Sequence, residues 1–535
     1  MRNKTILFIL IITLYGCGDP SENHRGLIPG HVSSIDFNIM DEAFMHGYTH
    51  NIVYETVELD TLPTLTIQCT SEETHRDGPD FQPELDFFSV WTRDLYWGFL
   101  GWAQAGDDRV LEMMKSSIQL LILAKERNQA LGQSELWPLD NKRYYVPQAY
   151  TTGLKSALNL FPWCSESQAD FLLLCHDYWE LSGDIKFIRS IWNEIEYVTE
   201  TLELLDTDGN SLPDAIQGSY DYMWIKEDSE EPLMCAKTSL AYQRVSSLAG
   251  ELGKDAFSSH LSQLSEKVKE TMNKTTEEGG LWKQDPGGGY YIQMRSVGET
   301  YDSIHDLFIP YNNLVPIWCD MTSRKQDHDI FTKLDASFDA IYNLDYGPMY
   351  CAPAGKNDES VMECSSVTWL AFLDIYLRGK KGHYNNRDRI YSLLMEHKGD
   401  AGGVPFPEGA GVYGYLTGGA GRSWDNGNFF HMLISGVYGI QKDRKGISLT
   451  NPNPLDSEPL TELHHVCWRD AVYDFSWQGA GSQIVKVSVN GKILKSANGK
   501  FILDAPHGHH AVVIELEPNS SPAPDSTFAI LLISS

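Results

Sequence analysis

Asp206-Thr-Asp-Gly-Asn-Ser-Leu-Pro-Asp-Ala-Ile-Gln-Gly-Ser-Tyr-Asp-Tyr-Met-Trp224 is a polar stretch, broken by glycine and proline, between two long helical patterns. The pattern before it covers residues 187–205, and the pattern after it covers residues 234–252. The connection between these two patterns is longer than a simple helix pair needs, and long loops usually carry function. The stretch therefore predicts a helical fold whose loops hold the chemistry.

The second half of this stretch combines a carboxylate with aromatic rings. Tyr220, Asp221 and Trp224 follow one another closely on the predicted loop. A sugar-cleaving site needs a proton source and flat surfaces for sugar faces. The same residues also fit a solvated turn with structural aromatics, so the rest of the chain has to decide between the two interpretations.

The first half of the stretch is similar to a calcium loop. Asp206, Asp208, Asn210 and Asp214 have a spacing that hints at metal ligation, but the full ligand series of an EF-hand is missing. We therefore interpret this half as a hydrogen-bonded turn that supports the loop. The sequence predicts neither a metal site nor a cofactor.

Helical patterns continue on both sides of the opening stretch. In residues 110–125, for example, apolar side chains return every three or four positions and form one stripe. The segments with this pattern are 110–125, 168–181, 187–205, 234–252, 256–273, 311–321, 366–377, 388–396 and 429–439. They come roughly in pairs, without the crisp sequence repeat of a tetratricopeptide-type solenoid.

The two ends of the chain have strand-like patterns. After about Lys445 the apolar period changes from 3.6 to 2, and Val485, Val487 and Val489 lead into the hairpin signal Asn490-Gly491. Residues 446–535 are therefore predicted to form a small antiparallel β-sandwich. Residues 35–80 are mixed and strand-like, and we expect a short β lead-in there.

Composition and charge restrict the class of ligand. The 535 residues include 73 acidic and 42 basic side chains, which gives a net charge of −31. A phosphate backbone would be repelled by such a field, so nucleic acid is not an expected partner. A neutral or basic substrate fits better than a polyanion.

The N-terminal residues predict export. Met1-Arg-Asn-Lys4 is a basic region, and the apolar run that follows it is too short to span a membrane as a mature helix. The run ends in Leu14-Tyr-Gly-Cys17, which resembles a bacterial lipobox, although Tyr15 is larger than the usual residue. We expect residues 1–17 to be a lipoprotein signal with Cys17 lipidated, and residues 18–34 to be a tether. The expected location is the bacterial cell envelope, with the membrane surface as a partner. A plain secretory signal is the alternative.

Eight further cysteines are scattered along the chain, and none forms a Cys-x-x-Cys pair. This pattern does not support a zinc ribbon or a redox motif. In a protein with a large core we expect mostly buried free thiols.

Two more clusters combine charged and aromatic side chains. Trp91-Thr-Arg-Asp94 places Arg93 beside Asp94 and next to aromatic residues, which can present donors, acceptors and ring faces to a polyol. A structural ion pair at a helix start is the alternative. Glu408 lies on a proline- and glycine-rich segment sixteen residues before Trp424. Tyr290 and Arg295 follow a glycine-rich turn and are further candidates to line a sugar cleft.

Taken in order, these features resemble the six-hairpin, (α/α)6-toroid glycosidases, which include glucoamylases, trehalases and α-glucosidase I-type enzymes. The resemblance covers about residues 85–520, and its motifs are short. It implies a mainly α fold, with a toroid catalytic domain over residues 81–445 and the β-sandwich after it. The implied activity is cleavage of an oligosaccharide from its chain ends with inversion of configuration.

The resemblance also implies residue roles. Trp91-Thr-Arg-Asp94 matches the Trp-x-Arg-Asp segment with which glucoamylases bind the non-reducing sugar. Ser219-Tyr-Asp-Tyr222 is similar to the acid motif Gly-Trp-Asp-Phe of trehalases, which makes Asp221 the implied acid. Glu408 lies at about the distance before Trp424 at which glucoamylases place their base, although Ser423 and Trp424 occur in reversed order.

The match is incomplete around the acid. In glucoamylases the acid directly follows a tryptophan, whereas Ile225 follows Trp224 here. We therefore retain Glu227 as a second candidate acid and Glu363 as a second candidate base. Three other functions remain open: a glycoside phosphorylase, a polysaccharide lyase on a similar toroid, and a carbohydrate-binding lipoprotein without catalysis.

Overall fold

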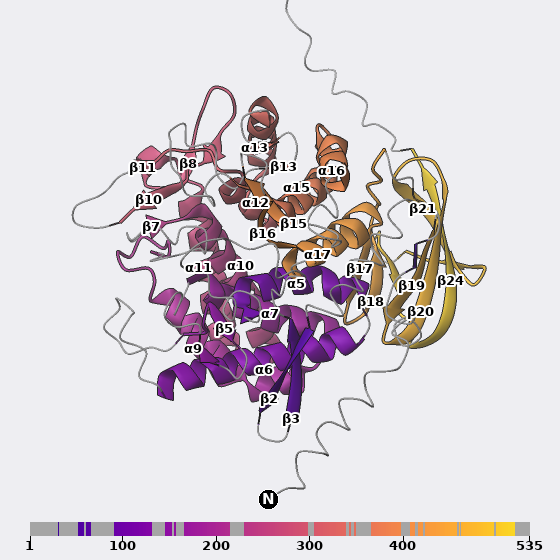
Figure 1. Cartoon of the computed structure of the whole chain (residues 1–535), viewed down its shortest axis with the longest axis horizontal. Coiled ribbons are helices and arrows are strands. Elements are labelled where there is room, and N and C mark those ends of the chain that lie inside the picture. Colours follow the sequence, from indigo (N-terminus) through magenta and orange to yellow (C-terminus); the bar gives the residue numbers. More distant parts are fainter. Residues whose placement is uncertain are drawn as a thin grey trace, which may run out of the picture.

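The protein is mainly helical, with a strand-rich region at its C-terminal end (Figure 1). The structure is a computed structural model. It describes residues 30–31, 52–57, 60–65, 90–106, 108–130, 145–151, 155–156, 165–214, 229–297, 304–338, 342–343, 347–348, 365–396, 407–411, 416–420, 423–456, 460, 462–496 and 499–518.

The described helices follow one another from residue 92 to residue 437. They are α5 (Thr92–Ala105), α6 (Asp108–Ala130), α7 (Ser165–Ser182), α8 (Ile185–Ser190), α9 (Trp192–Glu203), α10 (Pro232–Glu251), α11 (Asp255–Met272), α12 (Pro310–Trp318), α13 (Arg324–Ala336), α15 (Thr368–Lys381), α16 (Arg387–Glu396) and α17 (Ser423–Phe430), which continues as a π-helical segment η5 (His431–Val437). A 3-10 turn, η4 (Thr276–Glu278), follows α11.

Each apolar stripe predicted from the sequence lies on a helix, but four boundaries differ. The segment 311–321 extends three residues beyond α12, which ends at Trp318. The segment 187–205 is divided at Ile191 into α8 and α9. The segment 366–377 begins two residues too early, because Ser366 and Val367 belong to a strand. The segment 429–439 begins too late, since α17 already starts at Ser423.

Six of the described helices pack in a closed sequence. Helix α5 contacts α7, α7 contacts α10, α10 contacts α12, α12 contacts α15, and α15 contacts α17, which returns to α5. We call these six helices the ring helices. Between consecutive ring helices the chain makes a second helix, such as α6, α9 or α11, so the ring helices can run in the same direction. Figure 1 shows α5 and α17 beside each other near the centre.

Glycines bring α5 and α17 into backbone contact. A Cβ atom on Gly427 would overlap the backbone of Gly98, and a Cβ atom on Gly101 would overlap the backbone of Gly427. Both helices can therefore approach closely only because these positions carry no side chain. This approach closes the ring.

Helix α5 was not among the helices predicted from its periodicity. Twelve of its 14 residues are buried, among them Arg93, Asp94, Trp97 and Trp102. The charged side chains Arg93 and Asp94 at its start are buried together with the apolar ones, so its sequence does not read as a single apolar stripe.

The described strands are short except in the C-terminal region. They are β1 (Gly30–His31), β2 (Ile52–Val57), β3 (Asp60–Leu65), β4 (Val90–Trp91), β5 (Ala149–Thr151), β6 (Lys155–Ser156), β7 (Ser229–Glu230), β8 (Trp282–Lys283), β9 (Tyr290–Tyr291), β10 (Met294–Ser296), β11 (Ile304–His305), β12 (Tyr342–Asn343), β13 (Gly347–Pro348), β14 (Ser365–Val367), β15 (Pro407–Gly411), β16 (Leu416–Ala420), β17 (Ile440–Asp443), β18 (Gly446–Leu449), β19 (Glu462–Trp468), β20 (Asp470–Gly479), β21 (Gln483–Val489), β22 (Lys492–Leu494), β23 (Phe501–Leu503) and β24 (His507–Glu517).

The C-terminal region contains two sheets, with strand orders β1-β19-β20-β24-β21-β22 and β17-β18-β23. The hairpin predicted at Asn490-Gly491 is confirmed, because Val489 pairs with Lys492 across it. The expectation of a purely antiparallel domain is wrong, since β20 and β24 pair in parallel over their whole common length. The strands also begin at Ile440, before the predicted boundary at residue 446.

The N-terminal part contributes to both regions. Strand β1 pairs with β19, so residues 30–31 of the predicted tether belong to the C-terminal sheet. Within the predicted β lead-in the structure describes the hairpin β2–β3, which contacts α6; the hydroxyl of Thr64 lies 2.8 Å from that of Ser117.

None of the described helices is long and apolar enough to span a membrane. Cys175, Cys235, Cys319 and Cys467 are buried free thiols, as expected from their spacing. The remaining cysteines, including the predicted lipidation site Cys17, lie outside the described residues.

Candidate functional site

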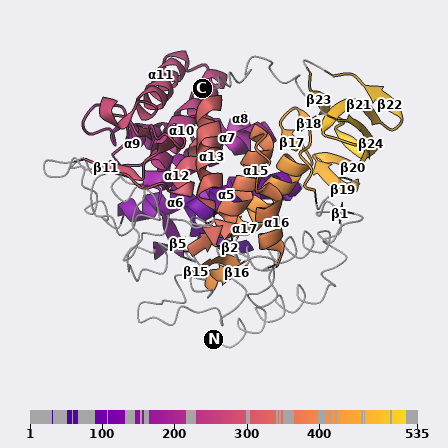
Figure 2. The ribbon, with the colours of Figure 1, turned by 90° about the horizontal axis from the view of Figure 1, so that it is seen from above.

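Short strands precede the starts of the ring helices. Strand β4 leads into α5, β7 into α10, β11 into α12, β14 into α15, and β16 into α17. These strands pair with one another in three small sheets, β4-β5-β6, β11-β10-β7 and β14-β15-β16. In Figure 2, β5, β15 and β16 lie toward the same end of the helical region. The starts of the ring helices therefore define one end of the ring.

Arg93 lies at this end, in the first turn of α5. Its side chain is only 4% exposed, and its guanidinium lies 4.9 Å from the ring centre of Trp424 on α17. It also approaches the hydroxyl of Tyr311 on α12 at 3.5 Å and the carboxylate of Glu166 on α7 at 3.6 Å. One side chain thus connects the starts of four ring helices.

Aromatic side chains pack around Arg93. The rings of Trp369 and Trp424 stack at 5.4 Å, and Trp97 lies 5.0 Å from Trp369. Tyr311 meets Trp369 edge to face at 5.9 Å. These rings come from α5, α12, α15 and α17, so they fix the relative positions of the helix starts and surround the guanidinium with apolar surface.

A buried ion cluster completes the group. Lys237, on α10, donates a hydrogen bond of 2.7 Å to Glu166 and also pairs with Asp170. All three side chains are at most 1% exposed. Burial lowers the pKa of Lys237, but the facing Asp170 and Glu166 carboxylates outweigh it and raise the pKa above its usual value. Lys237 is therefore protonated, and each of the six ring helices contributes a side chain to this site.

Among the predicted site residues, the structure brings Arg93 and Trp424 together. Trp91 precedes α5 and Asp94 follows Arg93, and both are buried, at 7% and 5% exposed. Tyr220, Asp221, Trp224, Glu227 and Glu363 lie outside the described residues.

Glu408 is described only through its backbone, in strand β15. The adjacent Gly409 pairs with Val367, the residue before α15. The next strand, β16, precedes α17. The backbone of Glu408 is therefore at the end of the ring where Arg93 lies.

Tyr290 and Arg295 have other contacts. The Tyr290 hydroxyl donates to Asp306 at 2.7 Å, and the ring of Tyr290 lies under the Lys333 ammonium at 4.9 Å. Arg295 pairs with Glu230 and donates to the carbonyl of Gly279 at 2.6 Å. None of these contacts connects either residue to the Arg93 cluster.

The segment 206–214 is a hydrogen-bonded turn, as expected. The backbone N–H of Ser211 donates to Asp206, that of Asn210 donates to Asp208, and that of Thr207 donates to Asp214. Carboxylate oxygens of Asp208, Asp214 and Glu230 lie within 4.8 Å of one another, a spacing that a metal ion would also accept. These carboxylates already accept hydrogen bonds within the protein, so the arrangement is explained by the turn itself.

Two buried carboxyls predict an unusual pH dependence of stability. Burial raises the pKa of Glu230 to about 7 and that of Asp214 to about 6. Between pH 5 and pH 7 these two groups bind more protons in the folded protein than in the unfolded chain, so their contribution to the free energy of unfolding decreases as the pH rises. Urea midpoints measured from pH 5 to pH 7 should fall.

The variant Glu230→Gln provides the control for this prediction. An amide does not titrate, so the decrease between pH 6 and pH 7 should become smaller. A wild-type stability that rises steadily over the same range would contradict the assignment of raised pKa values.

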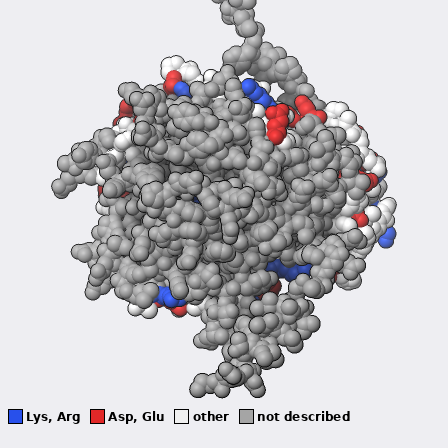
Figure 3. All heavy atoms as spheres, in the orientation of Figure 1, with Lys and Arg blue, Asp and Glu red and all other residues white. Residues whose placement is uncertain are grey.

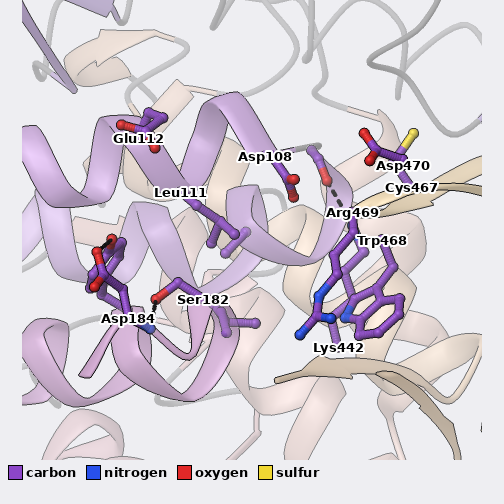
Figure 4. A pocket seen from close by; sticks show the side chains of 14 residues that line it. Asp108, Leu111, Glu112, Ser182, Asp184, Lys442, Cys467, Trp468, Arg469 and Asp470 are labelled. Carbon is purple, nitrogen blue, oxygen red and sulfur yellow. Dashed lines mark hydrogen bonds between the residues drawn. The ribbon is translucent and has the colours of Figure 1, made fainter. Parts of the chain in front are cut away.

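A cavity lies at the other end of α5 and α7. It has a volume of about 410 Å³ and lies against Gly106, just after α5, and Ser182, the last residue of α7. Figure 4 shows Asp108, Glu112, Asp184 and Asp470 around it, together with Lys442 and Arg469. Lys442 is not free in this cavity, since it donates to the carbonyl of Gly106 at 2.6 Å. The cavity is therefore distinct from the Arg93 site, and its walls lack the aromatic cluster.

On the described part of the face shown in Figure 3, acidic and basic side chains are interspersed at the margin, without a large patch of either sign.

Sequence reasoning missed Glu166, Asp170 and Lys237. Asp170 and Lys237 interrupt mainly apolar helical patterns, which is a signal for a buried charge that has a partner elsewhere. Glu166 lies among polar residues just before the predicted pattern and carries no such signal. Glu166 and Asp170 are four residues apart and so share one helix face. The sequence cannot show that Lys237, 71 residues later, is that partner.

Comparisons with known proteins agree on fold similarity at low identity. No protein-family model matches the sequence, and no curated protein matches it. A solved chain named Sialidase is 12% identical, with a TM-score of 0.51, and the match covers 84% of this chain and 38% of that one. A family GH78 rhamnosidase of Bacillus sp. GL1 is 13% identical with a TM-score of 0.49 (73% and 37% covered), and a bacterial glucoamylase complexed with acarbose is 13% identical with a TM-score of 0.45 (65% and 49% covered). The chain spans between 37% and 49% of the length of these structures. Its similarity to the chain named Sialidase is a similarity of fold.

Proposed function

We propose that this protein is a glycoside hydrolase that cleaves oligosaccharides from their chain ends. The observation that carries the proposal is the meeting of all six ring helices at one charged and aromatic site. Arginine donors and aromatic rings are groups with which proteins hold sugars, and the predicted sugar-binding residues Arg93 and Trp424 meet at this site. In the sequence, the segment with Asp221 precedes α10, and the strand with Glu408 precedes α17.

We further propose that the ring helices form the inner ring of an (α/α)6 toroid. Consecutive ring helices pack against each other, the last packs against the first, and further helices lie between them in the chain. The fold that this chain shares with a chain named Sialidase supports a carbohydrate-active protein in general.

In the proposed mechanism two carboxyl groups act on opposite sides of the bond. Asp221 donates a proton to the leaving oxygen, and Glu408 removes a proton from the attacking water. Inversion requires the two groups to be about 6.5–9.5 Å apart, so that the water fits between Glu408 and the sugar. Tyr220, Tyr222 and Trp224 next to Asp221 in the sequence would exclude water and keep Asp221 protonated.

The same site fits alternatives that differ in chemistry. A glycoside phosphorylase would use phosphate in place of water, and a polysaccharide lyase would need an anionic substrate. A carbohydrate-binding lipoprotein would keep the aromatic site without turnover. We propose export and a lipid anchor at Cys17 from the N-terminal sequence, which agrees with a polymeric substrate outside the cytoplasm.

A panel of aryl glycosides and plant or microbial oligosaccharides tests the function. We expect release of free sugar from at least one compound, at a rate independent of added phosphate. Turnover that requires phosphate would show that the protein is a phosphorylase and not a hydrolase. Saturable sugar binding without turnover would favour the binding protein.

A further inference from the structure

The cations at the Arg93 site are already paired with carboxylates. Glu166 lies between two of them, with one oxygen 2.7 Å from the Lys237 ammonium and the other 3.6 Å from the Arg93 guanidinium. Asp170 is the second carboxylate against Lys237. The positive charges of Arg93 and Lys237 are therefore balanced inside the protein.

This pairing matters because the group is buried. Arg93, Glu166 and Lys237 are at most 4% exposed, so water screens their interactions weakly. A substrate carboxylate that approached Arg93 would meet the negative charge of Glu166 at close range. An uncharged sugar would meet only a hydrogen-bond donor and aromatic faces.

We propose that Glu166 is a specificity-determining residue, which keeps Arg93 and Lys237 from binding an anion and so restricts the site to uncharged sugars. The proposal rests on the proposed function and names its substrate class. The excluded ligands are sugars that carry a carboxylate, such as uronic and sialic acids, at the position next to Arg93. Asp170 pairs with Lys237, whereas Glu166 is the carboxylate that lies against both Lys237 and Arg93.

The test compares matched substrates. An aryl hexoside and the corresponding aryl hexuronide differ only in a hydroxymethyl and a carboxylate group, and their kcat/KM ratio measures the selectivity. The wild type is expected to prefer the uncharged member of the pair. Inhibition by the free hexose and by the free hexuronic acid gives the same comparison without relying on the leaving group.

The variant Glu166→Gln leaves Arg93 and Lys237 without their shared carboxylate. The value of kcat/KM for the uncharged substrate divided by that for the acidic substrate is expected to fall by about tenfold or more. The reason is that the substrate carboxylate could then take the place of the Glu166 carboxylate and accept a charged hydrogen bond. The variant Lys237→Met removes one cation and leaves Glu166, so the same ratio should rise. The opposite signs distinguish specificity from general damage to the site.

A matched control exists on α15. Arg378 and Asp374 form an ion pair that is also fully buried, at 2.9 Å, and Arg378 connects to Asp335 on α13 rather than to the Arg93 cluster. The variant Asp374→Asn should lower the stability and leave the selectivity ratio unchanged.

Each outcome decides the proposal. A wild type that prefers the hexuronide, or a folded Glu166→Gln variant with an unchanged ratio, would overturn it. If the variants do not fold, the wild-type ratio alone still decides. If no glycoside is cleaved, the proposed hydrolase function is wrong. The affinities for the hexose and for the hexuronic acid, measured by calorimetry, then test the role of Glu166 independently.

Discussion

Replacement of Asp221 by asparagine is expected to lower kcat by about 10²–10⁴-fold on a glycoside with a poor leaving group. The loss should shrink when the leaving group is a good one, such as a dinitrophenolate, because such a group departs with little help from an acid. Glu408→Gln should lower kcat by a similar factor for both kinds of leaving group, since a base acts on the attacking water. Rates measured on the two substrates separate the two roles.

The control for both variants is Glu266→Gln, on the exposed face of α11. It makes the same chemical change away from the ring and should not alter kcat. If Asp221→Asn and Glu408→Gln keep full activity, both assignments are wrong, and Glu227 and Glu363 become the next candidates.

The substitution Gly427→Ala is expected to destabilise the protein by about 1–3 kcal/mol or more. A methyl group there would overlap the backbone of Gly98, and a backbone cannot move aside as a side chain can. The same contact holds Arg93 of α5 beside Trp424 of α17, so activity should also decrease. Urea unfolding and kcat/KM measure the two effects.

The matched control is Gly250→Ala in helix α10. A Cβ atom there would come no closer than 3.7 Å to another atom, the Ser258 hydroxyl. Alanine favours a helix over glycine by about 0.5–1 kcal/mol, so this variant should be as stable as the wild type or more stable. A Gly427→Ala variant with unchanged stability and activity would show that the approach of α5 and α17 is looser than described.

Much of the helical fold was predictable because its outer helices are amphipathic. The stripes of α6 and α11 are clear in the sequence, since one face of each helix meets solvent. Helix α5 was missed because charged residues, Arg93 and Asp94, are buried beside its aromatic ones, so its sequence does not show a simple apolar stripe. The parallel pairing of β20 with β24 was missed because the alternation of a strand does not specify its neighbour.

The site was predictable only in part. Arg93 and Trp424 stood out because charged and aromatic residues occur together in short segments, and the structure brings these two side chains into contact. Glu166 and Lys237 escaped because their partnership spans 71 residues and depends on the packing of α7 against α10. The roles of Asp221 and Glu408 remain predictions from the sequence.

The central claim is that two carboxyl groups cleave a glycosidic bond at the Arg93 end of the ring with inversion of configuration. Proton NMR of the sugar released in the first turnovers tests it most directly, because the anomeric signals report cleavage and stereochemistry together. The account predicts a free sugar whose anomeric configuration is opposite to that of the substrate. Release of the retained anomer, or binding of sugar without any release, would contradict it.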